Sequence, residues 1–130
     1  MVERLHDVVI DTTGGNDAVV FDDVHVLGSL RIRMRGGDDL FTTTDAGAAG
    51  VVRVEMGRGN DNLFLDGASC AKGSYIRLGT GDDILHLDVV RADPRAVFNG
   101  GDGADTLELF LIPPSPAPSL LGFESVTVEP

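Results

Sequence analysis

Apolar and polar residues alternate along most of this chain, and the alternation restarts at a fixed interval. The first apolar positions of one series are 22 residues apart, namely Val19, Phe41, Leu63, Leu85 and Leu107. Two residues further on, the series continues with Phe21, Thr43, Leu65, Leu87 and Leu109. A period of two is typical of β-strands with one buried face, so each interval is predicted to contain a strand here.

Two more series have the same interval. One has apolar positions Val8 and Ile10, Leu30 and Ile32, Val52 and Val54, Ile76, and Val97 or Phe98, with the mostly charged neighbours Arg31, Arg33, Arg53, Glu55 and Arg77. The other is a column of small residues, Val24, Val26, Ala46, Ala48, Ala68, Cys70, Val90 and Ala92. Each interval therefore predicts three short strands with inward faces.

Glycine and acidic residues mark the turn between two of these strands. The aspartates of the series are Asp17, Asp39, Asp61, Asp83 and Asp105, and two residues before them stand Gly15, Gly37, Gly59, Gly81 and Gly103. Between each pair lies Asn16, Asp38, Asn60, Asp82 or Ala104. Because chains with repeats of this length stack each repeat on the last, we predict a right-handed parallel β-helix or β-roll-like solenoid.

The predicted solenoid forms a single domain over residues 1–130, with five to six rungs of 22 residues between about 8 and 112. A proline-rich loop at 113–119 then interrupts the repeat, and a closing strand is predicted over about 123–128. A helical alternative fails because glycines interrupt every candidate stretch. Incompletely capped terminal rungs would allow end-to-end self-association.

Stacking would bring the repeat aspartates into one column. Neighbouring carboxylates about 4.8 Å apart repel by about 1 kcal/mol in water and by more at a lower dielectric. Protonation, hydrogen bonds from turn amides, or bound cations could offset this repulsion. Calcium is the favoured cation because it takes carboxylate and carbonyl oxygens, whereas zinc lacks its preferred Cys and His ligands. The metal-free alternative is that each aspartate caps the amides of its own turn.

The turns resemble those of the RTX, or haemolysin-type, calcium-binding repeats. The segment GGDGADTLE from Gly100 to Glu108 matches the nonapeptide G-G-x-G-x-D-x-U-x in full. The segments from Gly57 and Gly79 have Met56 and Leu78 at the first glycine, and those from Gly36 and Gly14 keep only the later Gly and Asp.

This resemblance implies that Asp17, Asp39, Asp61, Asp83 and Asp105 are calcium ligands together with carbonyls of the preceding turn residues. It also implies a secreted or cell-surface protein. One departure concerns the repeat itself: RTX-like rolls carry the motif twice in each 18-residue circuit, whereas this chain carries it once in 22 residues. Calcium would therefore bind along one edge only.

The composition excludes several classes of function and structure. The net charge is −11, and 16 of the 21 acidic residues are Asp, a residue that favours turns, so binding to nucleic acid is not expected. The lone Cys70 excludes an intrachain disulfide and fits a buried small residue. No membrane span or signal peptide is recognised.

No catalytic constellation is recognised, since His25 and His86 have no matching Ser or Cys partner. The leading hypothesis is a non-catalytic calcium-binding structural module. One alternative is a β-helix that binds or processes an acidic polysaccharide through its arginine-bearing sheet, which also includes Arg35 and Arg58 nearby. The other alternative is a metal-free structural spacer. The competing interpretation of the arginines is that they form a solvated strand face, where they balance the charge of nearby acidic residues and bind no ligand.

Overall fold

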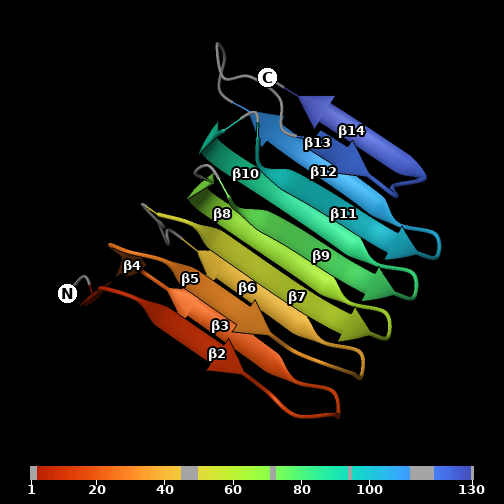
Figure 1. The fold of residues 1–130 in the computed structure, drawn as a ribbon, viewed down its shortest axis with the longest axis horizontal. Coiled ribbons are helices and arrows are strands. Elements are labelled where there is room, and N and C mark those ends of the chain that lie inside the picture. The colour runs from red at the N-terminus through yellow and green to blue at the C-terminus, as the bar shows by residue number, and fades with distance from the viewer. Residues whose placement is uncertain (1–2, 45–49, 71–72, 94, 112–118, 130) are drawn as a thin grey trace.

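The computed structural model describes residues 3–44, 50–70, 73–93, 95–111 and 119–129, and in those ranges the chain consists of strands and turns without a helix. The strands stack as the rungs of a parallel β-solenoid (Figure 1). In the described residues no helix is therefore available that could cross a membrane. The all-β solenoid predicted from the repeat is confirmed.

Two six-stranded parallel sheets form the long sides of the solenoid. The first sheet contains β2 (Val8–Asp11), β5 (Leu30–Arg33), β7 (Val52–Arg58), β9 (Tyr75–Thr80), β11 (Val97–Asp102) and β13 (Ser119–Leu121). The second sheet contains β3 (Ala18–Asp22), β6 (Leu40–Thr44), β8 (Asn62–Cys70), β10 (Ile84–Ala92), β12 (Thr106–Leu111) and β14 (Ser125–Glu129). The third side is described where β1 (Glu3–Leu5) pairs with β4 (Val24–Val26).

The register between neighbouring strands reproduces the spacing in the sequence. Leu30 pairs with Val8 and with Val52, and Phe98 pairs with Ile76, each 22 residues away. The spacing holds through about four full turns, slightly fewer than the five to six rungs expected from the sequence, and partial turns at the two ends complete the sheets. At the C-terminal end the interval shortens, because Thr106 pairs with Ser125.

The closing strand expected over 123–128 corresponds to β14, and β13 is an additional strand that the sequence did not predict. Residues 113–118 of the expected loop, Ala46 and Ala48 lie outside the described residues. So do the side chains of Ala68, Cys70, Val90 and Ala92.

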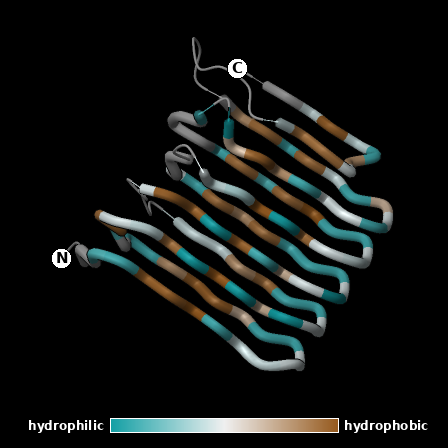
Figure 2. The backbone as a smooth tube through the Cα atoms, viewed as in Figure 1, coloured by the Kyte–Doolittle hydropathy of each residue, from teal (hydrophilic) through white to brown (hydrophobic). Residues whose placement is uncertain are grey.

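The core lies between the two sheets and is built from the alternating apolar positions. Residues such as Leu63, Leu85 and Leu107 on the second sheet, and Val54 and Ile76 on the first, are completely buried. In Figure 2 the strands carry the hydrophobic stretches, whereas the turns between the two sheets are mostly hydrophilic. Burial of each large apolar side chain stabilises the fold by about 1.5–3 kcal/mol.

One buried column was not expected from the sequence. Met34, Met56 and Leu78, which replace the first glycine of the turn motif, are each fully buried in the core. The strand alternation thus extends two residues further toward the turn than the motif comparison indicates. These side chains contribute to the core directly beside the acidic turns.

Candidate functional site

The Gly-Asp turns connect the first sheet to the second at one edge of the solenoid. The glycine two residues before each repeat aspartate has a positive φ, between +120° and +135°, which residues with a side chain rarely adopt. The turns also approach each other closely: a Cβ added to Gly81 would overlap the carbonyl oxygen of Gly59. Glycine is therefore required here by conformation and by packing.

The five repeat aspartates lie one above another, as the spacing predicts. Four of them are buried, with Asp39 only 1% exposed and Asp61, Asp83 and Asp105 fully buried, so the column faces the interior. We call these residues, together with Asp17, the inner Asp column.

Hydrogen bonds join the inner Asp column from turn to turn. The amide of each aspartate donates to Oδ1 of the aspartate 22 residues later: Asp17 to Asp39, Asp39 to Asp61 and Asp61 to Asp83 at 2.8 Å, and Asp83 to Asp105 at 3.0 Å. The predicted capping by turn amides therefore does occur, but between turns rather than within one. Each carboxylate holds the neighbouring turn in register.

The column ends at Glu124, which the sequence analysis did not single out. The amide of Asp105 donates to Glu124 Oε2 at 2.7 Å, although Glu124 is 19 rather than 22 residues later. A longer side chain thus replaces the missing sixth aspartate where the register shortens. The sequence contains one signal of this contact, which is an acidic residue that follows Asp105 at an interval shorter than the repeat.

The second oxygen of every inner carboxylate has no partner. Oδ2 of Asp17, Asp39, Asp61, Asp83 and Asp105 is buried, and no described residue forms a hydrogen bond with it. A buried carboxylate oxygen without a partner is unfavourable when it carries charge. Five such atoms in one column are the main unsatisfied polar feature of this edge.

The electrostatics follow from this burial. Desolvation raises the pKa of Asp61 and of Asp83 from 3.8 to about 6, against the lowering effect of the amide hydrogen bond each accepts. Repulsion from neighbouring aspartates adds to the increase. The pKa values of Asp39 and Asp105 are also raised, again chiefly by burial. The column therefore favours neutralisation, by protons or by a cation.

The residues between glycine and aspartate form a separate, outer column. Their side chains are exposed and accept hydrogen bonds in the opposite direction, from the amide 22 residues later. The donors and acceptors are Asp38 to Asn16 at 2.8 Å, Asn60 to Asp38 and Asp82 to Asn60 at 2.9 Å, and Ala104 to Asp82 at 3.0 Å. The sequence grouped these residues with the repeat aspartates, but the structure separates the two columns.

The outer column ends at Ala104, because its amide donates to Asp82 Oδ1 but alanine has no side-chain oxygen to accept from the amide of a further turn. The structure thus ends both hydrogen-bonded columns at the C-terminal turn, one at Ala104 and the other at Glu124.

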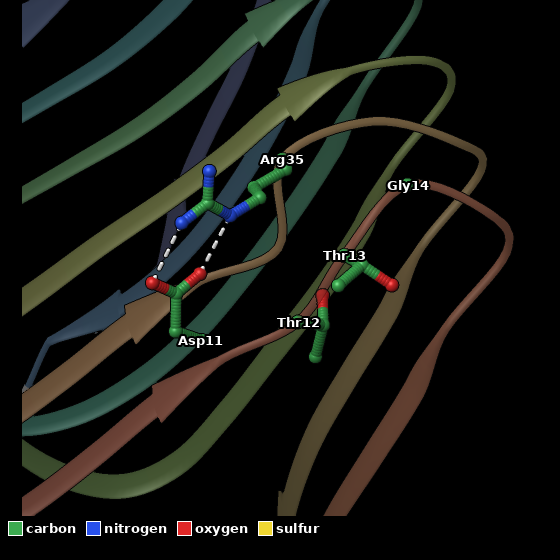
Figure 3. Close-up of a pocket in the computed structure, with 5 residues that line it drawn as sticks. All are labelled: Asp11, Thr12, Thr13, Gly14 and Arg35. Atoms are coloured by element: carbon green, nitrogen blue, oxygen red, sulfur yellow. Dashed lines mark hydrogen bonds and ion pairs between the residues drawn. The ribbon is translucent and has the colours of Figure 1, made fainter.

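A different hollow lies beside the first turn, where the surface recess of 440 Å³ is lined by Asp11, Thr12, Thr13, Gly14 and Arg35 (Figure 3). The Arg35 guanidinium donates to both oxygens of Asp11, at 2.7 and 2.8 Å. Arg35 has a φ of 82° at a position where later turns have Gly57, Gly79 and Gly101. This ion pair satisfies both partners, so the recess offers no free charge to a ligand.

The described residues contain no group of three or more His, Cys, Asp or Glu side chains arranged to hold a metal ion. Any ion at the Gly-Asp edge must therefore use backbone carbonyls as well as carboxylates. Comparison of the chain with protein-family models, with curated proteins and with solved structures finds no match.

Proposed function

We propose that this chain is a non-catalytic structural module that binds calcium at its Gly-Asp edge. The observation that carries the proposal is a contrast between the two columns. Both use one side-chain oxygen as an amide acceptor, which Asn supplies as well as Asp, and the outer column alternates Asn16, Asp38, Asn60 and Asp82. The inner column contains aspartate at all five positions, although its burial makes charge costly there.

Aspartate differs from asparagine in the second carboxylate oxygen and the negative charge, and both features strengthen calcium binding. The unpartnered Oδ2 atoms are the carboxylate oxygens available for that purpose. An ion beside them would offset the repulsion between neighbouring carboxylates and satisfy oxygens that the protein leaves unsatisfied. Carbonyls of the glycine-rich turns would complete the oxygen ligands.

The C-terminal turn suits an ion best. At Gly100 there is no side chain, whereas the corresponding positions in three earlier turns are filled by the buried Leu78, Met56 and Met34. The point where a Cβ on Gly100 would stand lies 2.6 Å from Asp105 Oδ2 and 2.6 Å from the Gly122 carbonyl oxygen. Asp105 Cβ lies 2.8 Å from the same point, so the Asp105 side chain and the returning chain at Gly122 occupy the place of the apolar side chain, and their two oxygens converge beside Gly100.

Glu124 adds a second carboxylate at this turn, since its Oε2 accepts from the Asp105 amide. We therefore assign Asp105, Glu124 and the Gly122 carbonyl as the ligands of the principal ion, beside the Gly100 backbone. The full match of this turn to the RTX-like nonapeptide points to the same place. The extracellular location implied by that resemblance remains a prediction.

A metal-free structural spacer is the second candidate, and the amide hydrogen bonds of the inner column favour it. In that case protons rather than calcium would neutralise the buried carboxylates. The two candidates differ at neutral pH, where a spacer gains no stability from added calcium.

The test is isothermal titration calorimetry with calcium at pH 7.5, combined with thermal unfolding in a chelator and in 10 mM calcium. A site with a dissociation constant near 0.1 mM would stabilise the fold by about 2.7 kcal/mol under these conditions. For a domain of this size that corresponds to an increase in melting temperature of about 10 °C. Absence of both heat and a melting shift would reject the calcium role.

Two variants locate the ion. Asp105→Asn keeps the amide acceptor but removes the charge, and Glu124→Gln likewise keeps a side-chain oxygen for the Asp105 amide while removing the second carboxylate. Both should lose the calcium response while folding in chelator. Asp17→Asn is the matched control at the opposite end of the column and should keep the response. An unchanged response in Asp105→Asn would contradict the assignment to this turn.

A further inference from the structure

The outer face of the first sheet is basic, although the chain as a whole is strongly acidic. Arg31 and Arg53 are paired side by side in the register of β5 and β7, and Arg77 lies one strand further along, beside Glu55. All three arginines are exposed. We call Arg31, Arg53 and Arg77, with the neighbouring Tyr75, the arginine face.

The carboxylate within this face is already engaged. Glu55 Oε2 accepts from the Arg33 guanidinium at 3.3 Å, and Glu55 Oε1 accepts from the Tyr75 hydroxyl at 3.0 Å. Among the residues that the structure describes, no carboxylate forms an ion pair with Arg31, Arg53 or Arg77. Within the described residues, three guanidinium groups therefore lack a carboxylate partner, although the chain has a net charge of −11.

Arg31 and Arg53 stand on neighbouring parallel strands, whose backbones lie about 4.8 Å apart. Two like charges at that separation would repel by about 1 kcal/mol in water. The Arg53 guanidinium carbon lies 6.0 Å from the centre of the Tyr75 ring, which holds this side chain over the sheet. A bound anion between Arg31 and Arg53 would remove the repulsion.

A surface recess lies at the same place. It has a volume of 370 Å³ and is lined by Val9, Ser29, Leu30, Arg31, Val51 and Arg53. A smaller recess with Arg31, Arg53, Glu55 and Tyr75 in its lining continues toward β9. Cationic, hydroxyl and apolar groups therefore line one strip across four strands, from β2 to β9.

We propose that the arginine face binds an acidic polysaccharide, with carboxylates of successive sugars on Arg31 and Arg53. Guanidinium groups recognise carboxylates through paired hydrogen bonds, and the exposed Val9 and the Tyr75 ring offer apolar surface to a sugar ring. A nucleic acid fits less well, because Glu55 lies beside Arg77 in the register and the net charge of −11 repels a continuous phosphate backbone. The site is on a different face from the Gly-Asp edge and does not depend on calcium.

The test is calorimetric titration of the whole protein with hexagalacturonate at low ionic strength, in a chelator that prevents calcium from bridging sugar and protein. A heparin-derived hexasaccharide tests whether sulfate replaces carboxylate, and binding of either supports the proposal. Arg31→Gln and Arg53→Gln should each weaken binding about tenfold or more, since each removes charge-assisted hydrogen bonds. Both substitutions are on an exposed face and leave the core intact.

Arg58→Gln is the matched control, because it removes the same charge from an exposed position five residues further along β7. Its affinity for the oligosaccharide should stay within about twofold of that of the unmodified protein. Three results would overturn the proposal: no binding of either acidic oligosaccharide, an equal loss in all three variants, or tighter binding of a single-stranded DNA oligonucleotide than of both sugars.

Discussion

The inner Asp column predicts an unusual dependence of stability on pH. Burial raises the pKa of Asp61 and of Asp83 to about 6 in the folded chain, from 3.8. Between these two values the folded state binds more protons than the unfolded state. The stabilisation that protonation of Asp61 and Asp83 gives to the folded state is therefore fully present below about pH 4 and is lost as the pH rises through 6.

The magnitude follows from the size of the pKa change. An increase from 3.8 to about 6 corresponds to about 3 kcal/mol for one carboxyl group. Asp61 and Asp83 are neighbours in the column and titrate as a coupled pair, so their contributions do not simply add. We expect the metal-free protein to lose about 3 kcal/mol or more between pH 4 and pH 7.5, which is a large part of the stability of an ordinary domain.

Urea denaturation in chelator, followed by circular dichroism at intervals from pH 4 to pH 7.5, measures this loss. Hydrogen bonds from Ser29 and Arg35 are the main cause of the lowered pKa values of Asp7 and Asp11. The stability that these two groups contribute is lost only as the pH falls below 3.8, which is outside the measured range. The Asp61→Asn variant keeps the amide acceptor without the charge and should show a flatter pH profile and higher stability at pH 7.5. The reasoning is refuted if stability rises from pH 4 to pH 7.5, or if Asp61→Asn keeps the full pH dependence.

Four substitutions test other parts of the structure by urea denaturation. Glu124→Ala leaves the Asp105 amide without its acceptor and should lower the free energy of unfolding by about 1–3 kcal/mol. A decrease of less than about 0.5 kcal/mol would show that water replaces the Glu124 carboxylate as acceptor. Gly81→Ala forces a Cβ against the neighbouring turn at a φ of +132° and should cost more than about 2 kcal/mol, whereas Gly14→Ala meets nothing closer than 3.8 Å and should cost less than about 1. Leu85→Ala removes a fully buried side chain and should cost about 2–5 kcal/mol; a smaller cost would contradict the described core.

The sequence predicted the repeat accurately because each turn of a solenoid has the same environment as its neighbours. Apolar residues at Leu63, Leu85 and Leu107 recur because each packs on the same interior surface of the preceding rung. The same logic placed Asp39, Asp61 and Asp83 in one column without any tertiary information. Motif comparison alone was less informative, since it gave no indication that Met34 and Met56 fill the core beside the column.

The C-terminal turn was predicted least well because the 22-residue spacing is no longer kept there. Glu124 completes the inner column from 19 residues away, and β13 adds a strand that no pattern indicated. The Gly122 carbonyl lies against Gly100 only because of this shortened return. Irregular contacts of this kind leave no periodic signal in the sequence.

By itself, the sequence determined the solenoid, its interval and the alignment of the aspartates, because periodic burial and turn residues act locally and identically in every rung. Only the tertiary structure decided which way each column faces. It separates an interior column of charged groups with unpartnered oxygens from an exposed one, because the side chains of adjacent residues in a turn point to opposite sides of the backbone. It also decided which arginines lack a carboxylate partner within the described residues, since ion pairing depends on distances between side chains of different rungs.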